Sequence, residues 1–139
     1  MKNNSTSSLL FNKPEFKSST GIAELLRITV TPAHTKVDFG YQTTDYYIKG
    51  GWVRIGKNTF IRIISTGEKL LMRSSDNIPM APNRLDFKTT KDWLYFSLYF
   101  PPLPLNTEEI DLIEAEKGNA SDFNYYKIKL NPKSAIKLR

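Results

Sequence analysis

Three aromatic side chains alternate along one short stretch and are the residues best suited to recognition chemistry. In the segment DWLYFSLYF (92–100), Trp93, Tyr95 and Tyr99 share one face with Ser97 if the segment is a strand. Rings that join an apolar body to a hydroxyl or an indole N–H suit a half-exposed sheet face. Such rows also line grooves that bind carbohydrates or peptides. The pattern therefore predicts either ordinary sheet surface or a partner-binding surface.

A second set of residues could contact phosphate groups. Strand alternation in FNYYKIKL (123–130) places Tyr125, Lys127 and Lys129 on one face, and an aromatic ring with two lysines can follow a nucleic-acid backbone. The alternative is a polar outer face, because lysines also protect terminal edge strands from pairing with other chains. Both interpretations stay open at this point.

The positive charge of the chain is concentrated near its C-terminus. The net charge is +6, yet residues 124–139 hold five basic residues and no acidic one, which leaves fifteen basic and fourteen acidic residues elsewhere. This distribution predicts either a solvated basic tail or a contact with nucleic acid, an anionic membrane or an acidic partner.

Catalytic and metal-binding chemistry has little support in the sequence. The absence of cysteine excludes disulfides, thiolate metal sites and cysteine nucleophiles. The single histidine, His34, falls in a turn, so a triad or a histidine metal site would depend on it alone. Glu108 and Glu109 would point to opposite faces of a strand, and Glu114 with Glu116 suits a solvated edge. We therefore expect no enzyme, no catalytic residue, no cofactor and no metal.

The elements that carry these residues are short strands. Hydrophobic residues alternate with period two around Leu26, Ile28 and Val30, and again over Val37, Phe39 and Tyr41. Leu94, Phe96, Leu98 and Phe100 form the apolar face of their segment and are expected in the core. The prolines of FPPLPL (100–105) cannot continue a strand ladder and predict a rigid crossing between two sheets.

One segment is ambiguous between strand and helix. Residues 107–116 (TEEIDLIEAE) have a good helix N-cap in Asn106 or Thr107 and a C-cap in Gly118. The strands that surround the segment favour a further strand.

Length and composition indicate one globular domain. A chain of 139 residues, 40% hydrophobic and 24% charged, can bury a core without disulfides. We expect a flexible N-terminal arm over 1–20, a β-sandwich domain over 21–130 and a basic tail over 131–139. About 7–9 short strands separated by turn signals predict an all-β, immunoglobulin-like antiparallel β-sandwich.

The sequence gives no sign of export or of membrane insertion. The first twenty residues lack the apolar core of a signal peptide, and no stretch approaches the roughly 18 apolar residues of a membrane helix. The expectation from this is a cytoplasmic protein with no membrane span.

Three motifs resemble a family of small bacterial domains. The runs at Ser97–Pro104, Thr107–Glu114 and Phe123–Leu130 resemble the pattern F-x-L-x-F-x-P-L-P, I-D-L-I-E and F-x-x-x-x-I-x-L of small immunoglobulin-like β-sandwich domains of unknown function in Bacteroidetes-type proteins. The resemblance covers about Leu26–Leu130. It implies an accessory module with no assigned catalytic residues, and it makes an extracellular location possible.

The sequence thus predicts a binding or structural module rather than an enzyme. The expected mode of action is protein–protein contact, either with a single partner or as a subunit of a larger assembly. The candidate partner-binding residues are Trp93, Tyr95, Tyr99, Tyr125, Lys127 and Lys129. The alternative is a nucleic-acid-binding accessory protein that uses the basic C-terminal strand and tail.

Overall fold

A computed structural model gives the fold. The structure describes residues 8–20, 23–42, 52–83, 85–86, 93–116 and 122–138. These residues form thirteen strands and no helix, so the prediction of an all-β fold is confirmed for the part of the chain described.

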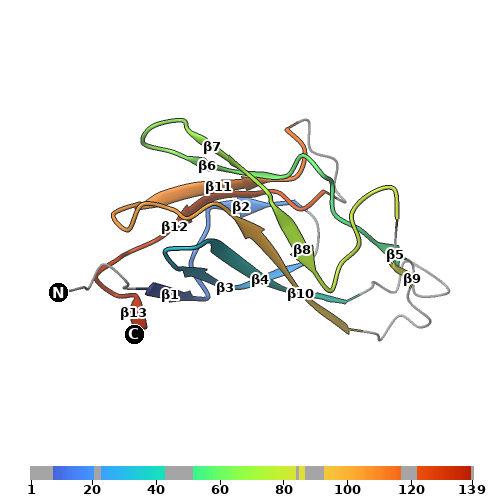
Figure 1. Ribbon diagram of the computed structural model, residues 1–139, viewed down its shortest axis with the longest axis horizontal. Helices are drawn as coiled ribbons and strands as arrows, with labels where there is room; N and C mark the ends of the chain where they lie inside the picture. The colour runs from blue at the N-terminus through green and yellow to red at the C-terminus, as the bar shows by residue number, and fades with distance from the viewer. Residues whose placement is uncertain are drawn as a thin grey trace.

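Two antiparallel sheets lie face to face (Figure 1). The first sheet has the order β13-β1-β3-β4-β10-β8, with bounds Ile136–Leu138, Ser8–Asn12, Glu24–Val30, Thr35–Gln42, Trp93–Phe100 and Ser74–Asp76. The second sheet has the order β2-β12-β11-β6-β7, with bounds Ser18–Ser19, Tyr125–Lys129, Glu109–Ile113, Phe60–Ile63 and Lys69–Leu71. A separate pair joins β5 (Trp52–Val53) to β9 (Leu85–Asp86). The architecture is therefore that of a β-sandwich.

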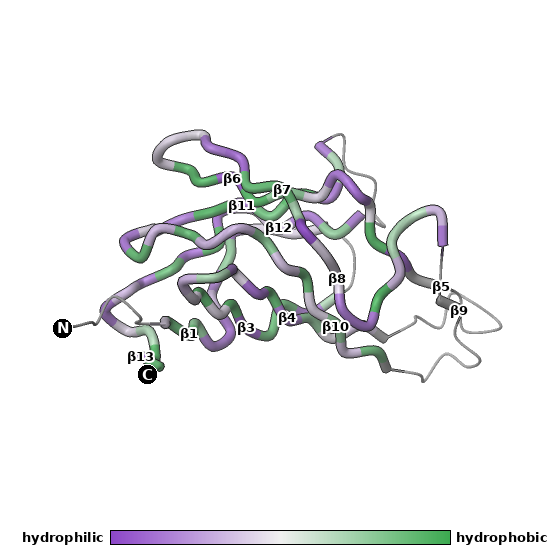
Figure 2. Tube along the Cα trace, viewed as in Figure 1, coloured by the Kyte–Doolittle hydropathy of each residue, from purple (hydrophilic) through white to green (hydrophobic). Residues whose placement is uncertain are grey.

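The core fills the space between the two sheets. The apolar side chains of β10 are all buried, as their alternation predicts: Leu94, Phe96, Leu98 and Phe100 are at most 8% exposed. Figure 2 shows the same alternation of hydrophobic and hydrophilic residues along β3 and β4. Phe39 of β4 links the layers, because its ring lies 5.1 Å from Phe96 and 5.4 Å from Tyr125 of the second sheet.

Two irregularities break the simple alternation. In β12, Leu112 pairs with Tyr125 while Ile110 pairs with Ile128, so one extra residue is inserted, and Lys127 adopts a φ of 55°. A bulge of this kind makes the residues just before and just after it, here Tyr125 and Ile128, face the same side of the sheet. A second shift in β3 turns Leu25 into the core, where the pattern had placed Leu26.

Both predicted termini need correction. Of the arm expected over 1–20, residues 8–20 include β1 and β2, and Leu9 and Phe11 are core residues. Of the tail expected over 131–139, Ile136–Leu138 forms β13 and pairs with β1. The reason is that each segment supplies a strand to a sheet edge. Residues 1–7 lie outside the described residues.

The structure shows the path of the proline-rich segment 100–105 and the conformation of the segment 107–116. After β10 the prolines lead the chain from the first sheet into β11 of the second, which confirms the predicted crossing. Leu103 is buried there, and its N–H donates to Thr35 Oγ1 at 2.9 Å. Glu109–Ile113 is a strand that pairs with β6 and β12, because its apolar side chains are needed in the core.

Candidate functional site

The outer surface of the first sheet carries the strongest candidate site, here called the β10 face. It consists of the outward side chains of β10 and of its neighbour β4: Tyr95, Ser97, Tyr99, Lys36 and Asp38. The antiparallel register places Ser97 opposite Asp38 and Tyr99 opposite Lys36. Paired side chains of this kind lie within about 5.5 Å at Cβ and interact directly.

Tyr95 is the most exposed large side chain of this face. It is 63% exposed. Its partner across the ladder is Gly40, which offers no side chain beside the ring. The strand is held in place at the same residue, because Asn77 Nδ2 donates to the Tyr95 carbonyl at 2.6 Å. Tyr95 therefore presents an aromatic surface from a fixed backbone.

A charged network occupies the middle of the β10 face. Asp38 accepts a hydrogen bond from Ser97 Oγ and forms an ion pair with Arg27, whose Nε lies 2.8 Å from Oδ2. Lys36 Nζ is 3.7 Å from Asp38 Oδ1. Asp38 is largely buried, and its negative charge is balanced by Arg27, Lys36 and the hydroxyl of Ser97. This network fixes the shape of the surface around the tyrosines.

Tyr99 is held more tightly than Tyr95. It is partly buried, and its ring meets the ring of His34 edge to face at a centroid distance of 5.1 Å. Lys36 Nζ lies 6.0 Å from the same centroid, at the limit of a cation–π contact. His34 therefore packs against an aromatic ring, and its position gives no support for catalysis.

The predicted site residues fall into separate groups. Tyr95 and Tyr99 do share the outer face, as the alternation predicts. The backbone of Trp93 lies in β10, but its side chain lies outside the described residues. Lys127 and Lys129 are exposed on β12 of the second sheet, so the structure does not bring them to the tyrosines.

The prediction that Tyr125 faces outward is wrong. Tyr125 is fully buried, and its hydroxyl donates to the Ala23 carbonyl at 2.6 Å. The bulge after Tyr125 is the cause, because the inserted residue lets Lys127 face solvent while Tyr125 faces the core. Burial raises the pKa of the Tyr125 hydroxyl well above its ordinary value. Tyr125 is thus unable to stack on a nucleic-acid base.

Sequence reasoning missed a buried polar cluster where β11 ends. Asn124 is fully buried: its Oδ1 accepts from the N–H groups of Glu114 and Ala115, and its Nδ2 donates to the Ala115 carbonyl and to Tyr126 Oη. The side chain of Asn124 therefore supplies the hydrogen-bond partners that backbone groups of a neighbouring strand would otherwise give to the end of β11. An asparagine beside a turn was the only available signal, and it is a common one.

Glu114 completes this cluster and joins three parts of the chain. Its Oε2 accepts from Gly56 N at 2.7 Å, and its Oε1 accepts from Phe123 N at 2.8 Å. Burial is the largest influence on this carboxyl and raises its pKa above the ordinary value of 4.5, although both hydrogen bonds oppose the rise. Since both oxygens are already used by backbone donors, the role of Glu114 is structural.

Replacing Glu114 by glutamine should lower stability in a pH-dependent way. The amide nitrogen of Gln cannot accept, so one backbone N–H loses its partner, at about 1–3 kcal/mol. A raised pKa means that the folded wild type binds this proton more tightly than the unfolded chain. Its stability contribution is complete below about pH 4.5 and is lost as the pH rises through the folded pKa.

The difference in unfolding free energy between wild type and Glu114→Gln should therefore be largest below about pH 4.5 and should narrow as the pH rises through the folded-state pKa of Glu114. Urea titrations of both proteins across this range measure it. A difference that widens with pH would show that ionised Glu114 is the favoured form.

Metal-binding clusters and membrane-spanning helices are both absent from the described residues. They contain no cluster of three His, Cys, Asp or Glu side chains able to hold a metal ion. They also include no helix with the length and apolar character needed to cross a membrane. In comparisons with known proteins, no family model, no curated protein and no solved structure matches the chain.

Proposed function

We propose that the protein is a non-catalytic binding module that contacts another protein through the β10 face. The observation that carries this proposal is the exposure of Tyr95, which is 63% accessible on the outer face of β10. Tyrosine is enriched at protein interfaces, because it buries a large rigid area with few rotatable bonds and keeps a hydrogen-bonding hydroxyl. The charged network around Asp38 supports the proposal by holding the surface in one shape before binding.

The immunoglobulin-like assignment is part of the same proposal. In immunoglobulin domains, strands A, B, E and D form one sheet, and G, F and C form the other, extended by C′ in some domains. The order β3-β4-β10-β8 matches A-B-E-D, and the order β12-β11-β6-β7 matches G-F-C-C′, in the same sequence along the chain. This agreement supports the proposed immunoglobulin-like topology.

Pull-down with a matched pair of variants tests the binding face. The full-length wild type, Tyr95→Ser and Leu71→Ser serve as baits in a nuclease-treated native lysate. Leu71 is the matched control, because it is 62% exposed but lies on β7 of the second sheet. We expect a protein retained by wild type and Leu71→Ser and at least tenfold depleted on Tyr95→Ser. Equal retention by all three would exclude this face.

The same variant should fold normally. Because Tyr95 is mostly exposed, Tyr95→Ser should change the free energy of unfolding by less than about 0.5 kcal/mol. Tyr99→Ser should have a larger effect, since Tyr99 packs against His34. Thermal melts of both variants measure this order. A large loss for Tyr95→Ser would make it a structural residue and remove it from the proposed surface.

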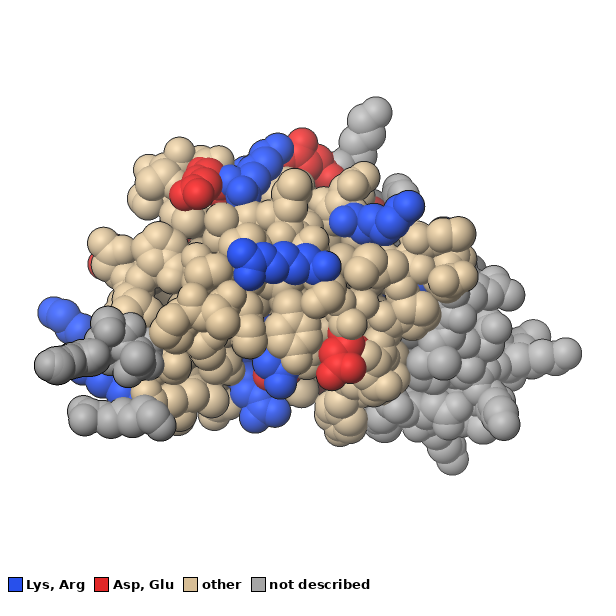
Figure 3. Space-filling view, viewed as in Figure 1, with Lys and Arg blue, Asp and Glu red and all other residues tan. Residues whose placement is uncertain are grey.

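Nucleic-acid binding through Lys127 and Lys129 is the second hypothesis. Their exposure on one strand supports it, whereas the burial of Tyr125 removes its stacking residue. On the side of the molecule in Figure 3, basic side chains are scattered, with acidic ones between them. This hypothesis predicts affinity for a single-stranded oligonucleotide that falls steeply with salt. Absent or salt-insensitive binding would reject it.

A further inference from the structure

The six-stranded sheet ends in a short, charged and exposed strand. β13 pairs with β1 over three residues, from Ser8 opposite Leu138 to Leu10 opposite Ile136. Ile136 is 54% exposed, and Lys137 is exposed as well. Short length and lysine are two of the features by which natural edge strands avoid pairing with other chains. β13 is thus a well-protected edge.

The neighbouring strand, β1, lacks these protective features. β1 (SLLFN) is longer, carries no charge and contains three consecutive apolar residues, of which Leu9 and Phe11 are buried in the core. Leu10 points to the outer face beside Ile136. A longer, uncharged and apolar strand of this kind pairs readily with another chain once its edge is exposed.

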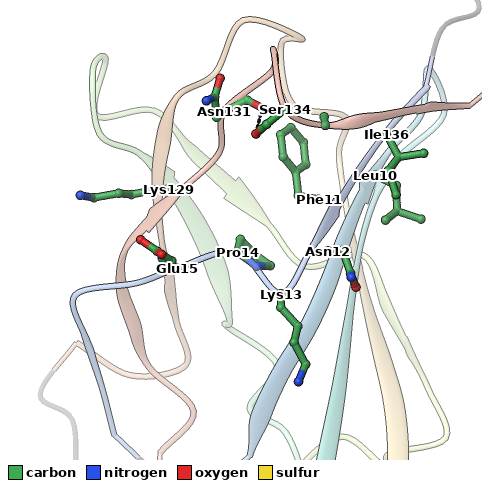
Figure 4. Close-up of a pocket in the computed structure, with 11 residues that line it drawn as sticks. Leu10, Phe11, Asn12, Lys13, Pro14, Glu15, Lys129, Asn131, Ser134 and Ile136 are labelled. Atoms are coloured by element: carbon green, nitrogen blue, oxygen red, sulfur yellow. Dashed lines mark hydrogen bonds between the residues drawn. The ribbon is translucent and has the colours of Figure 1, made fainter.

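The cover that β13 provides is incomplete. The register of β13 ends at Leu10, and the chain turns away over 131–135, where Ser134 N donates to the Asn131 carbonyl. A cavity of about 520 Å³ lies beside the remaining part of β1 (Figure 4). Its lining includes Phe11 and Pro14, together with the charged residues Lys13, Glu15 and Lys129. The edge of β1 is therefore partly open already.

We propose that β13 protects the edge of β1 from pairing with other chains, and that this edge of β1 is a latent self-association site for a second copy of this chain. Antiparallel pairing of two β1 strands about a twofold axis at Leu10 places Leu9 opposite Phe11 of the partner and Ser8 opposite Asn12 of the partner. Every such pair is uncharged, so no like-charge repulsion opposes the contact. The backbone groups that bond to β13 find the same partners in the second β1, in a closed, symmetric interface.

The absence of charge on β1 favours a second copy of the chain over a charged partner. Since β1 contains no charged residue, it offers no complementary group to an acidic or basic peptide. An identical apolar strand matches it in length and in side-chain type. The C-terminal segment then acts to keep the protein monomeric.

Removal of β13 tests the proposal. Sedimentation velocity compares the full chain with a chain that ends at Leu130, from about 5 to about 200 µM. We expect the full chain to stay monomeric and the shortened chain to form dimers that increase with concentration, while its Tm falls by only about 2–6 °C. Leu10→Lys in the shortened chain should restore the monomer, because two lysines would face each other at the twofold axis.

Two further variants keep the test decisive. Leu71→Lys in the shortened chain is the matched control, since Leu71 lies on the edge strand β7 of the other sheet; it should leave dimerisation unchanged. If the shortened chain does not fold, Ile136→Pro in the full chain releases β13 without deleting residues. A folded monomer in both cases, dimers abolished by Leu71→Lys but not by Leu10→Lys, or unfolding of both proteins would each overturn the proposal.

Discussion

Replacing Phe39 by alanine is expected to lower the free energy of unfolding by about 3–5 kcal/mol, the largest effect of any single substitution considered for this protein. Phe39 is 1% exposed, and its ring lies against Phe96 of its own sheet and Tyr125 of the facing sheet. Alanine would remove these contacts and leave a cavity between the two layers, which close packing prevents from collapsing fully.

Chemical denaturation of Phe39→Ala, Phe39→Leu and Phe16→Ala measures the effect. Phe39→Leu fills most of the volume and should cost roughly 1–2 kcal/mol. Phe16 is a matched control, because its ring also lies 5.4 Å from Tyr125 but is 37% exposed; its replacement should cost about 1 kcal/mol or less. Equal losses for Phe39→Ala and Phe16→Ala would contradict a core that joins the sheets through Phe39.

Replacing Asn124 by alanine is the second large effect, with an expected loss of about 3 kcal/mol or more. The alanine variant leaves the N–H groups of Glu114 and Ala115 and the Ala115 carbonyl without their side-chain partner. Because Asn124 is fully buried, water cannot replace these bonds without opening the structure. The end of β11 and the start of β12 would then be joined by their ladder pairing but not by the side chain of Asn124.

The variant Asn124→Asp separates the hydrogen bonds that the side chain accepts from the one that it donates to the Ala115 carbonyl. Its carboxylate can still accept from both N–H groups but cannot donate to the Ala115 carbonyl, and its burial as a charge is unfavourable. We expect Asp to be destabilising too, and increasingly so as the pH rises above its ordinary pKa of about 4. Urea titrations at acid and neutral pH measure both variants. A stability change below about 1 kcal/mol for Asn124→Ala would indicate that the strand end has other partners.

Local patterns predicted the regular parts of the fold. In β10 the side chains alternate without interruption, so its buried and exposed faces follow from the sequence. The prolines after Phe100 predicted the crossing between sheets, because a proline ring cannot donate to a ladder. The segment 107–116 shows the limit of such patterns: its capping residues favoured a helix, its neighbours favoured a strand, and the pairing of Glu109–Ile113 with β6 and β12 shows that it is a strand.

By itself, the sequence determined the all-β class, the absence of cysteine chemistry, the two-faced strand β10 and the exposure of Tyr95, since each depends on residue type or on a period of two. The tertiary structure alone decided the roles of Tyr125, Asn124 and the two terminal segments. A bulge changes the direction of every later side chain in its strand, and the pairing of β1 with β13 joins opposite ends of the chain. Both depend on contacts between residues distant in sequence, which no local pattern records.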